Sequence, residues 1–512
     1  MRSTPNASSA SSTRREVPDP TLLLGVDLGS SGVKAVLLDP ARGIIASSSR
    51  EVSLYSDHAG WAEADPAQWW RALCELVPEL LQRAAVSSRD VAAVAVAGMV
   101  PAVLVTDAAG EPLRRAILQN DARATSEIAE LREALAGVDL LHLTGSVLSQ
   151  QSVAPTLLWL ARHEPEVWAR TAVVQGSYDW LARALGAEVH VEENWALESG
   201  LFGLDHAPLS PVLGAISVEV PALPPVRAPG DVVGTLSERA ARETGLAAGT
   251  TIVVGGADHV LSAFGAGLVE PGDCLVKLGG AGDILAVSED VFVDERLYLD
   301  KHPQPGTWLP NGCMATSGSL LRWEQSLLGG VNLVELDAEA DASEPGALLA
   351  LPYFLGEKTP LHDPDLRGAI LGLHLATTRG DVHRSFLEAI AYGFRRHVDV
   401  FADGGLSIGR TRVTNGGSRS RLWRQILADV LNRDLVSIID HPGASFGAAV
   451  IAGVGCGLIA DWSYVEGALA PDEVISPDAS RAALYEERYH QFLDFTDVTT
   501  PLAHALARRH HD

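Results

Sequence analysis

The stretch TIVVGGADHVLSAFGAG, residues 251–267, decides the fold. Thr251 to Val254 is a short apolar and partly β-branched run, which is typical of a buried strand. The two glycines that follow allow a sharp turn, and apolar residues then recur at helical spacing from His259 onward. Asp258 therefore stands where a strand ends and a helix begins, the edge at which open α/β sheets bind ligands. It is either a site carboxylate or simply the helix N-cap, a position that aspartate favours.

The composition of the chain suits a compact soluble protein with two large domains. Its 512 residues are too many for one hydrophobic core, and 47% of them are hydrophobic and 20% charged. The formal net charge of −26 argues against a nucleic-acid or anionic-membrane partner. Because this charge also repels anionic ligands, and because the chain has only four lysines, we expect phosphate binding to depend on backbone amides, arginine and metal.

Cysteine spacing and the N-terminal composition predict where the protein resides. The four cysteines have neither zinc-site nor disulfide spacing, so we expect buried, reduced side chains. Residues 1–20 are rich in Ser, Pro and Arg without an apolar core, which favours a disordered tail over a secretory signal. The longest apolar run, residues 91–105, is too short to span a membrane. We expect a cytoplasmic protein without a membrane partner, and the sequence leaves a homodimer open.

The first folded segment is TLLLGVDLGSSGVKAVLLD, residues 21–39, which predicts two strands joined by a tight turn. The turn combines one acid with glycines and serines. It lacks the GxxxxGK[ST] pattern of a P-loop, but successive amides in such a turn form an anion nest. Asp27, at the end of the first strand, would suit a Mg²⁺ held largely through water. A plain β-turn is the alternative.

Two further segments of the first half carry side chains that suit a sugar. HAGWAEADPAQWW, residues 58–70, runs from a loop into an amphipathic helix. Trp61 in that loop can stack on a sugar face, although packing is the commoner role of such a residue. AILQNDARA places Asn120, Asp121 and Arg123 on one loop, where they could satisfy the hydroxyls of a polyol or form a solvated turn.

The second half repeats features of the first. It follows a Pro-rich segment, residues 208–229, which we expect to be a surface connection. After the stretch quoted above comes CLVKLGGAGDILAVS, residues 274–288, whose small-residue turn resembles the first turn and suggests a duplicated fold. A long helix at about 381–402 and a strand, turn and helix over 412–431 follow. The last motif, residues 443–458, predicts a Gly- and Ala-rich helix that either another helix or a flat ring approaches closely.

Together these motifs resemble the FGGY family of carbohydrate kinases, within the actin/hexokinase/Hsp70 ATPase superfamily. DLGSSGVKA resembles the family's first phosphate loop, GGADHVLSAFGAG the segment with the catalytic aspartate, and GGAG its Gly-Thr-Ser-Gly turn. TNGGSRSRLWRQILADVL and GASFGAAVIAGVGCG are similar to its second phosphate motif and its adenosine-side helix. The motifs keep the family order from about Leu22 to Asp494, and GWAEADPAQWW and NDAR most resemble the xylulokinase branch.

The resemblance implies an α/β fold with two RNase H-like (actin-like ATPase) domains around a deep interdomain cleft. Residues 21–250 would form an N-terminal domain that mainly binds sugar, and residues 251–500 a C-terminal domain that binds ATP. The implied activity is ATP-dependent phosphorylation of a small sugar, with Asp258 as the base that activates the attacking hydroxyl. ATP and Mg²⁺ are the implied cofactors, and a small sugar or polyol is the implied partner.

The same resemblance assigns the remaining site residues. Asp27 is the expected Mg²⁺ ligand. The expected nucleotide-binding residues are Gly29, Ser30, Ser31, Lys34, Gly279, Gly280, Ala281, Gly282, Gly416, Gly417, Ser418 and Ser420. The expected substrate-binding residues are Trp61, Met99, Val100, Pro101, Asn120, Asp121, Arg123 and Asp258.

Departures from the family pattern leave the substrate open among a pentulose such as xylulose, another polyol and a sugar acid. Pro101 replaces the histidine of Gly-Gln-Met-His-Gly, Gln119 replaces a tryptophan, and Gly280 and Ala281 replace the Thr and Ser of the phosphate turn. Loss of one hydrogen bond to a substrate hydroxyl shifts selectivity by about 1–3 kcal/mol. The rival functions are a sugar sensor without turnover and an ATP-driven chaperone or filament protein. The catalytic aspartate argues against the first, and the sugar-side loop against the second.

Overall fold

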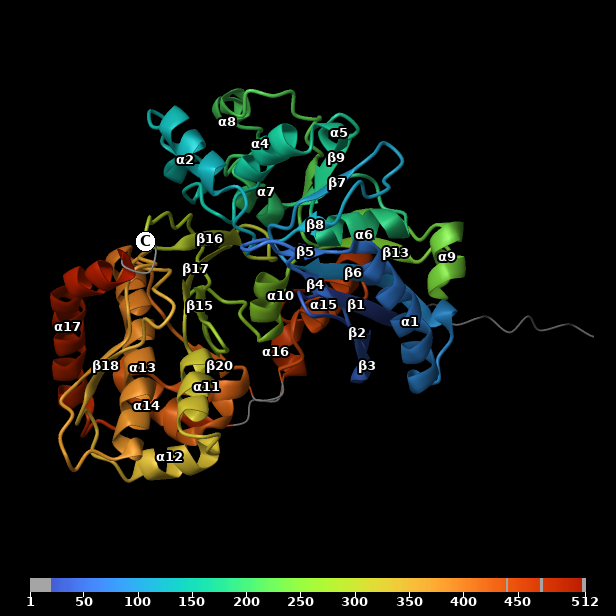
Figure 1. Ribbon diagram of the computed structural model, residues 1–512. Coiled ribbons are helices and arrows are strands. Elements are labelled where there is room, and N and C mark those ends of the chain that lie inside the picture. The colour runs from blue at the N-terminus through green and yellow to red at the C-terminus, as the bar shows by residue number, and fades with distance from the viewer. Residues whose placement is uncertain (1–19, 439–440, 470–472, 509–512) are drawn as a thin grey trace, which may run out of the picture.

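Two mixed β-sheets organise the computed structural model, which describes residues 20–438, 441–469 and 473–508 (Figure 1). Each sheet carries its own helices, so the predicted two-domain α/β architecture is confirmed. The predicted disordered tail, residues 1–20, falls outside the described residues except for Pro20. Within the described ranges, no helix combines the length and the apolar character that crossing a membrane requires.

The first sheet has the strand order β12-β13-β6-β1-β2-β3. Its strands are β1 (Leu22–Leu28), β2 (Gly32–Asp39), β3 (Gly43–Glu51), β6 (Val91–Gly98), β12 (Val232–Thr235) and β13 (Thr251–Ala257). β1, β2 and β3 are antiparallel neighbours, whereas β6 runs parallel to β1 and β13 runs parallel to β6. The predicted first hairpin is confirmed, because Leu28 of β1 pairs with Val33 of β2, with residues 29–32 between them.

The second sheet repeats this arrangement in the order β16-β17-β15-β14-β20-β21-β22. Its strands are β14 (Cys274–Leu278), β15 (Gly282–Ala286), β16 (Tyr298–Lys301), β17 (Trp308–Met314), β20 (Thr411–Thr414), β21 (Leu435–Ser437) and β22 (Val474–Ile475). β14, β15 and β17 take the places of β1, β2 and β3, and β20 and β21 are parallel as β6 and β13 are. The duplicated fold that the two hairpins suggest is present.

Strand β13 belongs to the first sheet, because it pairs with β6. The predicted boundary between residues 250 and 251 would assign β13 to the second domain, although β13 pairs with β6 in the first sheet. The chain enters the second sheet only at Cys274. Helix α10 (Asp258–Gly265) follows β13 directly. Ala257 is its N-cap, so Asp258 is the first helical residue and does not cap the helix.

Helix α15 (Ala444–Cys456) returns to the first domain and packs across β1, β6 and β13 (Figure 1). Its small residues make this possible. A Cβ atom on Gly25 of β1 would lie 1.9 Å from the Ser445 carbonyl oxygen, and one on Gly447 would lie 2.3 Å from the Leu261 carbonyl oxygen. The close approach predicted for residues 443–458 is thus made by a strand and by helix α10 of the first domain, with no flat ring needed.

Helices α1 (Pro66–Ala84) and α6 (Ser177–Leu185) cover the other face of the first sheet. Both faces are buried, since alternate residues of β1 join different core clusters. The other elements before β13 are β4 (Leu54–Tyr55), β5 (Glu63–Ala64), η1 (Ser88–Asp90), β7 (Leu104–Thr106), β8 (Ala116–Ile117), α2 (Thr125–Ala134), α3 (Leu140–Thr144), α4 (Val153–His163), α5 (Pro165–Trp168), β9 (Val173–Gln175), β10 (Val191–Glu192), α7 (Glu193–Ser199), α8 (Ser210–Ala215), β11 (Val226–Arg227) and α9 (Glu238–Thr244).

The second domain has its own core, in which α13 (Arg379–Asp403) is the long helix predicted from the sequence. The predicted strand, turn and helix over 412–431 are β20, η2 (Gly416–Arg419) and α14 (Arg421–Leu431). The remaining elements are α11 (Gly318–Leu327), α12 (Leu333–Asp341), β18 (Leu349–Leu351), β19 (Ala369–Leu371), α16 (Tyr464–Ala468) and α17 (Ala482–Arg508).

Candidate active site

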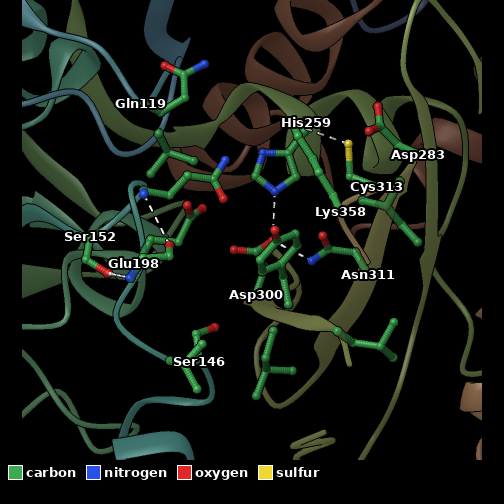
Figure 2. A pocket seen from close by; sticks show the side chains of 18 of the residues that line it. Gln119, Ser146, Ser152, Glu198, His259, Asp283, Asp300, Asn311, Cys313 and Lys358 are labelled. Atoms are coloured by element: carbon green, nitrogen blue, oxygen red, sulfur yellow. Dashed lines mark hydrogen bonds and ion pairs between the residues drawn. The ribbon is translucent and has the colours of Figure 1, made fainter. Parts of the chain in front are cut away.

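Asp258 lines a cavity of about 230 Å³ between the two domains. Figure 2 shows other side chains of its lining, among them Glu198, His259 and Asp300. The first domain contributes Val100, Gln119 and Glu198, and the second contributes residues of β15, β16 and β17. Carboxylates are prominent in this lining and include Glu198, Asp258, Asp283 and Asp300. Since both domains build the walls, a molecule bound here would contact both at once.

His259 connects Asp258 to the second domain. Its Nδ1 lies 3.7 Å from Oδ1 of Asp258, and its Nε2 lies 2.7 Å from Oδ2 of Asp300, an oxygen that also accepts a 2.8 Å hydrogen bond from Nδ2 of Asn311 (Figure 2). Burial disfavours a charged ring, but the carboxylates of Asp300 and Asp258 outweigh it and hold the pKa of His259 well above its usual range. His259 is therefore an imidazolium that contacts a carboxylate on each side.

Glu198 completes this buried cluster. Burial, and then the charge of Asp300, raise the pKa of Glu198 well above its usual range, so its carboxyl group favours the protonated form. Glu198, His259 and Asp300 offer ligand atoms within 4.8 Å of one another. Within this group, Nε2 of His259 and Oδ2 of Asp300 are joined by a 2.7 Å hydrogen bond.

Asp27 has the properties expected of a cation ligand. Its Oδ1 is buried and has no hydrogen-bond partner among the described residues. Burial, and then the charge of Asp258, raise the pKa of Asp27 to about 7. An unpaired buried carboxylate oxygen near a second carboxylate is costly unless a cation offsets the charge, and Mg²⁺ prefers oxygen ligands. The residues present therefore fit the Mg²⁺ predicted from the sequence.

A second cavity of about 700 Å³ lies beside the second hairpin turn. The structure brings together around it five of the predicted nucleotide-binding residues, which are Gly279, Gly280, Gly416, Gly417 and Ser420. Ala281, Gly282 and Ser418 lie outside its lining, and Ser418 donates its hydroxyl to the Asn415 carbonyl at 2.6 Å. Two turns that are distant in sequence thus form one wall.

His383 of α13 also lines this second cavity. Its Nδ1 lies 2.6 Å from Oε2 of Glu324 on α11, and its Nε2 lies 3.0 Å from Oδ1 of Asp337 on α12. Burial opposes protonation, but these two hydrogen bonds outweigh it and raise the pKa of His383 to about 9. One charged ring therefore holds three helices together behind the cavity.

The first hairpin turn lies outside the lining of both cavities. Ser30, Ser31 and Lys34 are exposed, and Gly29 donates its N–H to the Gly32 carbonyl at 2.9 Å. Their predicted part in nucleotide binding stays a prediction.

The sugar-side loop predicted from the sequence is engaged in internal contacts. Nη2 of Arg123 lies 2.7 Å from Oδ2 of Asp121 and 2.7 Å from Oε1 of Glu63. The guanidinium of Arg123 also stacks on Trp61, with its Cζ 3.7 Å from the ring centre. These side chains support the loop and are not in the lining of the first cavity, the one that Asp258 lines.

Of the other predicted substrate-binding residues, some line the first cavity and some do not. Val100 and Asp258 line the cavity, whereas Met99 and Pro101 are buried outside its lining and Asn120 is exposed. Gln119, next to Asn120, does line it, and its Oε1 is buried without a hydrogen-bond partner among the described residues.

The sequence pattern does not point to Glu198, Asp300 or Asn311. Asp300 and Asn311 come from β16 and β17, whose antiparallel pairing places them side by side at the cavity. His259 could have been identified, because it adjoins Asp258 at the start of α10.

Known proteins share this architecture. Residues 22–265 match the N-terminal domain and residues 285–456 the C-terminal domain of the FGGY family of carbohydrate kinases. A xylulose kinase of Staphylococcus epidermidis is 30% identical over 474 residues, which are 91% of this chain and 95% of that protein. A xylulose kinase of Escherichia coli is 29% identical over 489 residues, 94% of this chain and 100% of that protein. The crystal structure of xylulose kinase from Rhodospirillum rubrum is 39% identical, covers 94% of this chain and 100% of its own, and has a TM-score of 0.89. The chain therefore belongs to the FGGY family of carbohydrate kinases and is a phosphotransferase.

Proposed function

We propose that this protein transfers the γ-phosphoryl group of ATP to a hydroxyl of a small neutral sugar, most plausibly a pentulose such as xylulose, with Asp258 as the base. The observation that carries the proposal is the place of Asp258, on a cavity that both domains line and next to the buried Asp27. The relatives named xylulose kinases support the substrate.

The proposed reaction moves one proton and one phosphoryl group. The sugar oxygen bonds to the γ-phosphorus, the bond from that phosphorus to the β,γ-bridging oxygen breaks, and ADP leaves with the electron pair. The hydroxyl proton passes to Asp258. His259, whose Nδ1 lies 3.7 Å from Oδ1 of Asp258, would orient this carboxylate. Mg²⁺, held by Asp27, would supply charge neutralisation at the phosphates.

The second cavity is the proposed nucleotide site. Its wall of Gly279, Gly280, Gly416 and Gly417 allows backbone amides to approach phosphate oxygens without side chains in the way. The second hairpin carries residues of both cavities, since Asp283 lines the first and Gly279 and Gly280 the second. Domain closure on sugar binding would bring the two ligands together and exclude water.

The charge of the first cavity favours a neutral sugar over a sugar acid. Its carboxyl groups outnumber its cationic side chains, His259 and Lys358, so a carboxylate on the substrate would meet net repulsion. Carboxyl groups form hydrogen bonds with hydroxyls whether they are ionised or protonated. Gln119 offers a further free acceptor oxygen. A pentulose, pentitol or tetritol is therefore a better candidate than gluconate.

An ADP-release assay over ketopentoses, pentitols, tetritols and sugar acids tests the proposal. We expect turnover of a neutral five-carbon sugar, with D-xylulose among the best substrates, and turnover of sugar acids at least about 100-fold lower. Thermal stabilisation by a sugar without turnover of any would instead identify a sugar sensor. A sugar acid as the best substrate would refute the argument from cavity charge.

A further inference from the structure

Lys277 is a nearly buried lysine at the end of β14, just before the second hairpin turn. Its side chain is 12% exposed, and its Nζ lies 3.3 Å from Oδ2 of Asp283 on the neighbouring strand. Side chains alternate between the faces of a strand, and Val276 and Leu278 lie in the core of the second domain. Lys277 therefore faces the other way, like Leu275, which packs in the core cluster of the first domain.

Lys277 is not itself in the lining of either cavity, but its neighbours in the hairpin line both. Leu278 and Gly279, which follow it, line the proposed nucleotide cavity, and its partner Asp283 lines the proposed sugar cavity. The carboxylates of Asp283 and Asp258 act on it strongly enough to raise the pKa of Lys277 despite its burial. Its charge in turn offsets part of the rise in the pKa of Asp27. A fixed cation thus stands among the acids where the two proposed ligands would meet.

The turn that follows Lys277 lacks side-chain donors for phosphate, which a cation next to it could supply. Gly280 and Ala281 have no hydroxyl groups, so the turn offers phosphate only its amides. Phosphoryl transfer depends on neutralising charge on the oxygens of the transferred group. Lys358, the lysine in the lining of the sugar cavity, is exposed and lies 3.9 Å from Sγ of Cys313. Lys277 is more buried and is held next to the acids of the reaction.

We propose that Lys277 is a catalytic residue that contacts the γ-phosphoryl group of the bound nucleotide and neutralises its charge during transfer. This inference rests on the proposed function. Lys277 keeps its proton throughout and forms no covalent bond; the bonds that form and break are those of the phosphoryl transfer to the sugar. Asp283 positions the ammonium group before the nucleotide binds.

Lys277→Met and Lys277→Arg test this with two measurements, the affinities for ATP and ADP by calorimetry with Mg²⁺ and the kcat for the best sugar. We expect Lys277→Met to weaken ATP about tenfold or more, to leave ADP within about twofold, and to lower kcat about 100-fold. Lys277→Arg should regain part of both losses. A purely structural ion pair would not distinguish ATP from ADP.

Lys301→Met is the matched control. Lys301 lies on β16 of the same sheet, is 19% exposed, and has its Nζ 4.0 Å from Oε1 of Glu193. Its charge acts to lower the pKa of Glu193 and of His206, whereas that of Lys277 acts to lower the pKa of Asp27 and of Asp283, so this variant should keep both affinities and kcat. If Lys277→Met does not fold, Lys277→Met with Asp283→Asn removes the pair without leaving a buried unpaired carboxylate, and the ATP-selective loss should persist.

The outcomes separate this inference from the proposed function. Equal weakening of ATP and ADP, or a kcat within about threefold of the wild type, overturns the role of Lys277 while sugar turnover by the wild type upholds the kinase. A wild type that turns over no sugar refutes the proposed function. In that case the comparison of ATP with ADP still tests whether Lys277 contacts the terminal phosphate. A wild type that binds neither nucleotide refutes both.

Discussion

The two hairpins occupy equivalent places in the two sheets, and each carries one acid and one lysine near its turn. The strands that carry the acid and the lysine are exchanged between the two hairpins. In the first, Asp27 of β1 pairs with Lys34 of β2, whereas in the second Lys277 of β14 pairs with Asp283 of β15. The less exposed residue of the pair is the acid in the first hairpin and the lysine in the second. Lys34 is exposed and Asp27 is half-buried with its Oδ1 buried and without a partner among the described residues, while Lys277 is only 12% exposed and is paired with Asp283.

The exchange of acid and lysine between the two hairpins shows how two copies of one fold can bind different ligands. In both hairpins the charged pair stands one register position before the last pair at the turn, so the two hairpins differ in which strand carries the acid and which the lysine. A buried acid suits a metal ion, and a buried cation suits phosphate. Asp258, which acts electrostatically on both Asp27 and Lys277, stands between the two.

Asp258→Asn should have the largest effect, because it removes the proposed base. The side chains have similar volumes, so folding and nucleotide affinity should be almost unchanged. We expect kcat for the best sugar to fall about 1,000-fold or more. Steady-state kinetics together with ATP calorimetry measure both quantities. A variant that turns over sugar at the wild-type rate would refute the role of Asp258 as the base.

Gly25→Ala tests how differently the two sheets are packed. Gly25 lies two residues before Asp27, and the equivalent residue before Lys277 is Leu275. Since a Cβ on Gly25 would lie 1.9 Å from the Ser445 carbonyl oxygen, helix α15 must move. We expect a loss of about 3 kcal/mol in the free energy of unfolding, measured in urea. Gly137→Ala, where a Cβ meets no atom within 4 Å, should change little. Equal stability of the two variants would contradict the tight packing of α15.

Asp27→Asn tests the metal side of the comparison. If Asp27 holds Mg²⁺, the concentration of Mg²⁺ that gives half of the maximal rate should rise about tenfold or more, because a neutral amide binds the ion weakly. Asp39→Asn is the control, since Asp39 lies at the far end of the same hairpin and accepts a 2.9 Å hydrogen bond from the Ala41 N–H. An unchanged Mg²⁺ requirement in Asp27→Asn would place the metal elsewhere.

Local patterns predict the parts of this molecule that local physics determines. Alternation, small-residue turns and helical spacing predict both hairpins, the long helix α13 and the position of Asp258 after a strand. The loops at Gly279 and Gly416 are also predicted, and the structure brings them to one cavity. In each case the signal lies within about twenty residues.

Properties that depend on distant pairing are not predicted. Strand β13 joins β6 across some 150 residues of intervening chain, and no local pattern indicates this pairing. Asp300 reaches His259 only because β16 pairs with β17. Asp121 and Arg123 look like a sugar site because both are polar and close in sequence, yet Glu63 and Trp61 from another segment engage Arg123.

His383→Gln should change stability and its pH dependence more than catalysis, and its effect should be confined to the second domain. In the folded chain Glu324 and Asp337 raise the pKa of His383 to about 9, above the unfolded value near 6.5. The stabilisation from this charge is therefore complete below about pH 6.5 and is lost as the pH rises towards 9. Hydrogen-exchange protection of α11, α12 and α13 should decline over that range in the wild type and stay nearly level in His383→Gln. Protection of β1 and β2 should be the same in both proteins, because the first hairpin packs against α1 and α15, and not against these helices. If β1 and β2 lose protection together with α13, the two halves respond to pH as one cooperative unit, and the separation of roles drawn from the hairpins does not extend to stability.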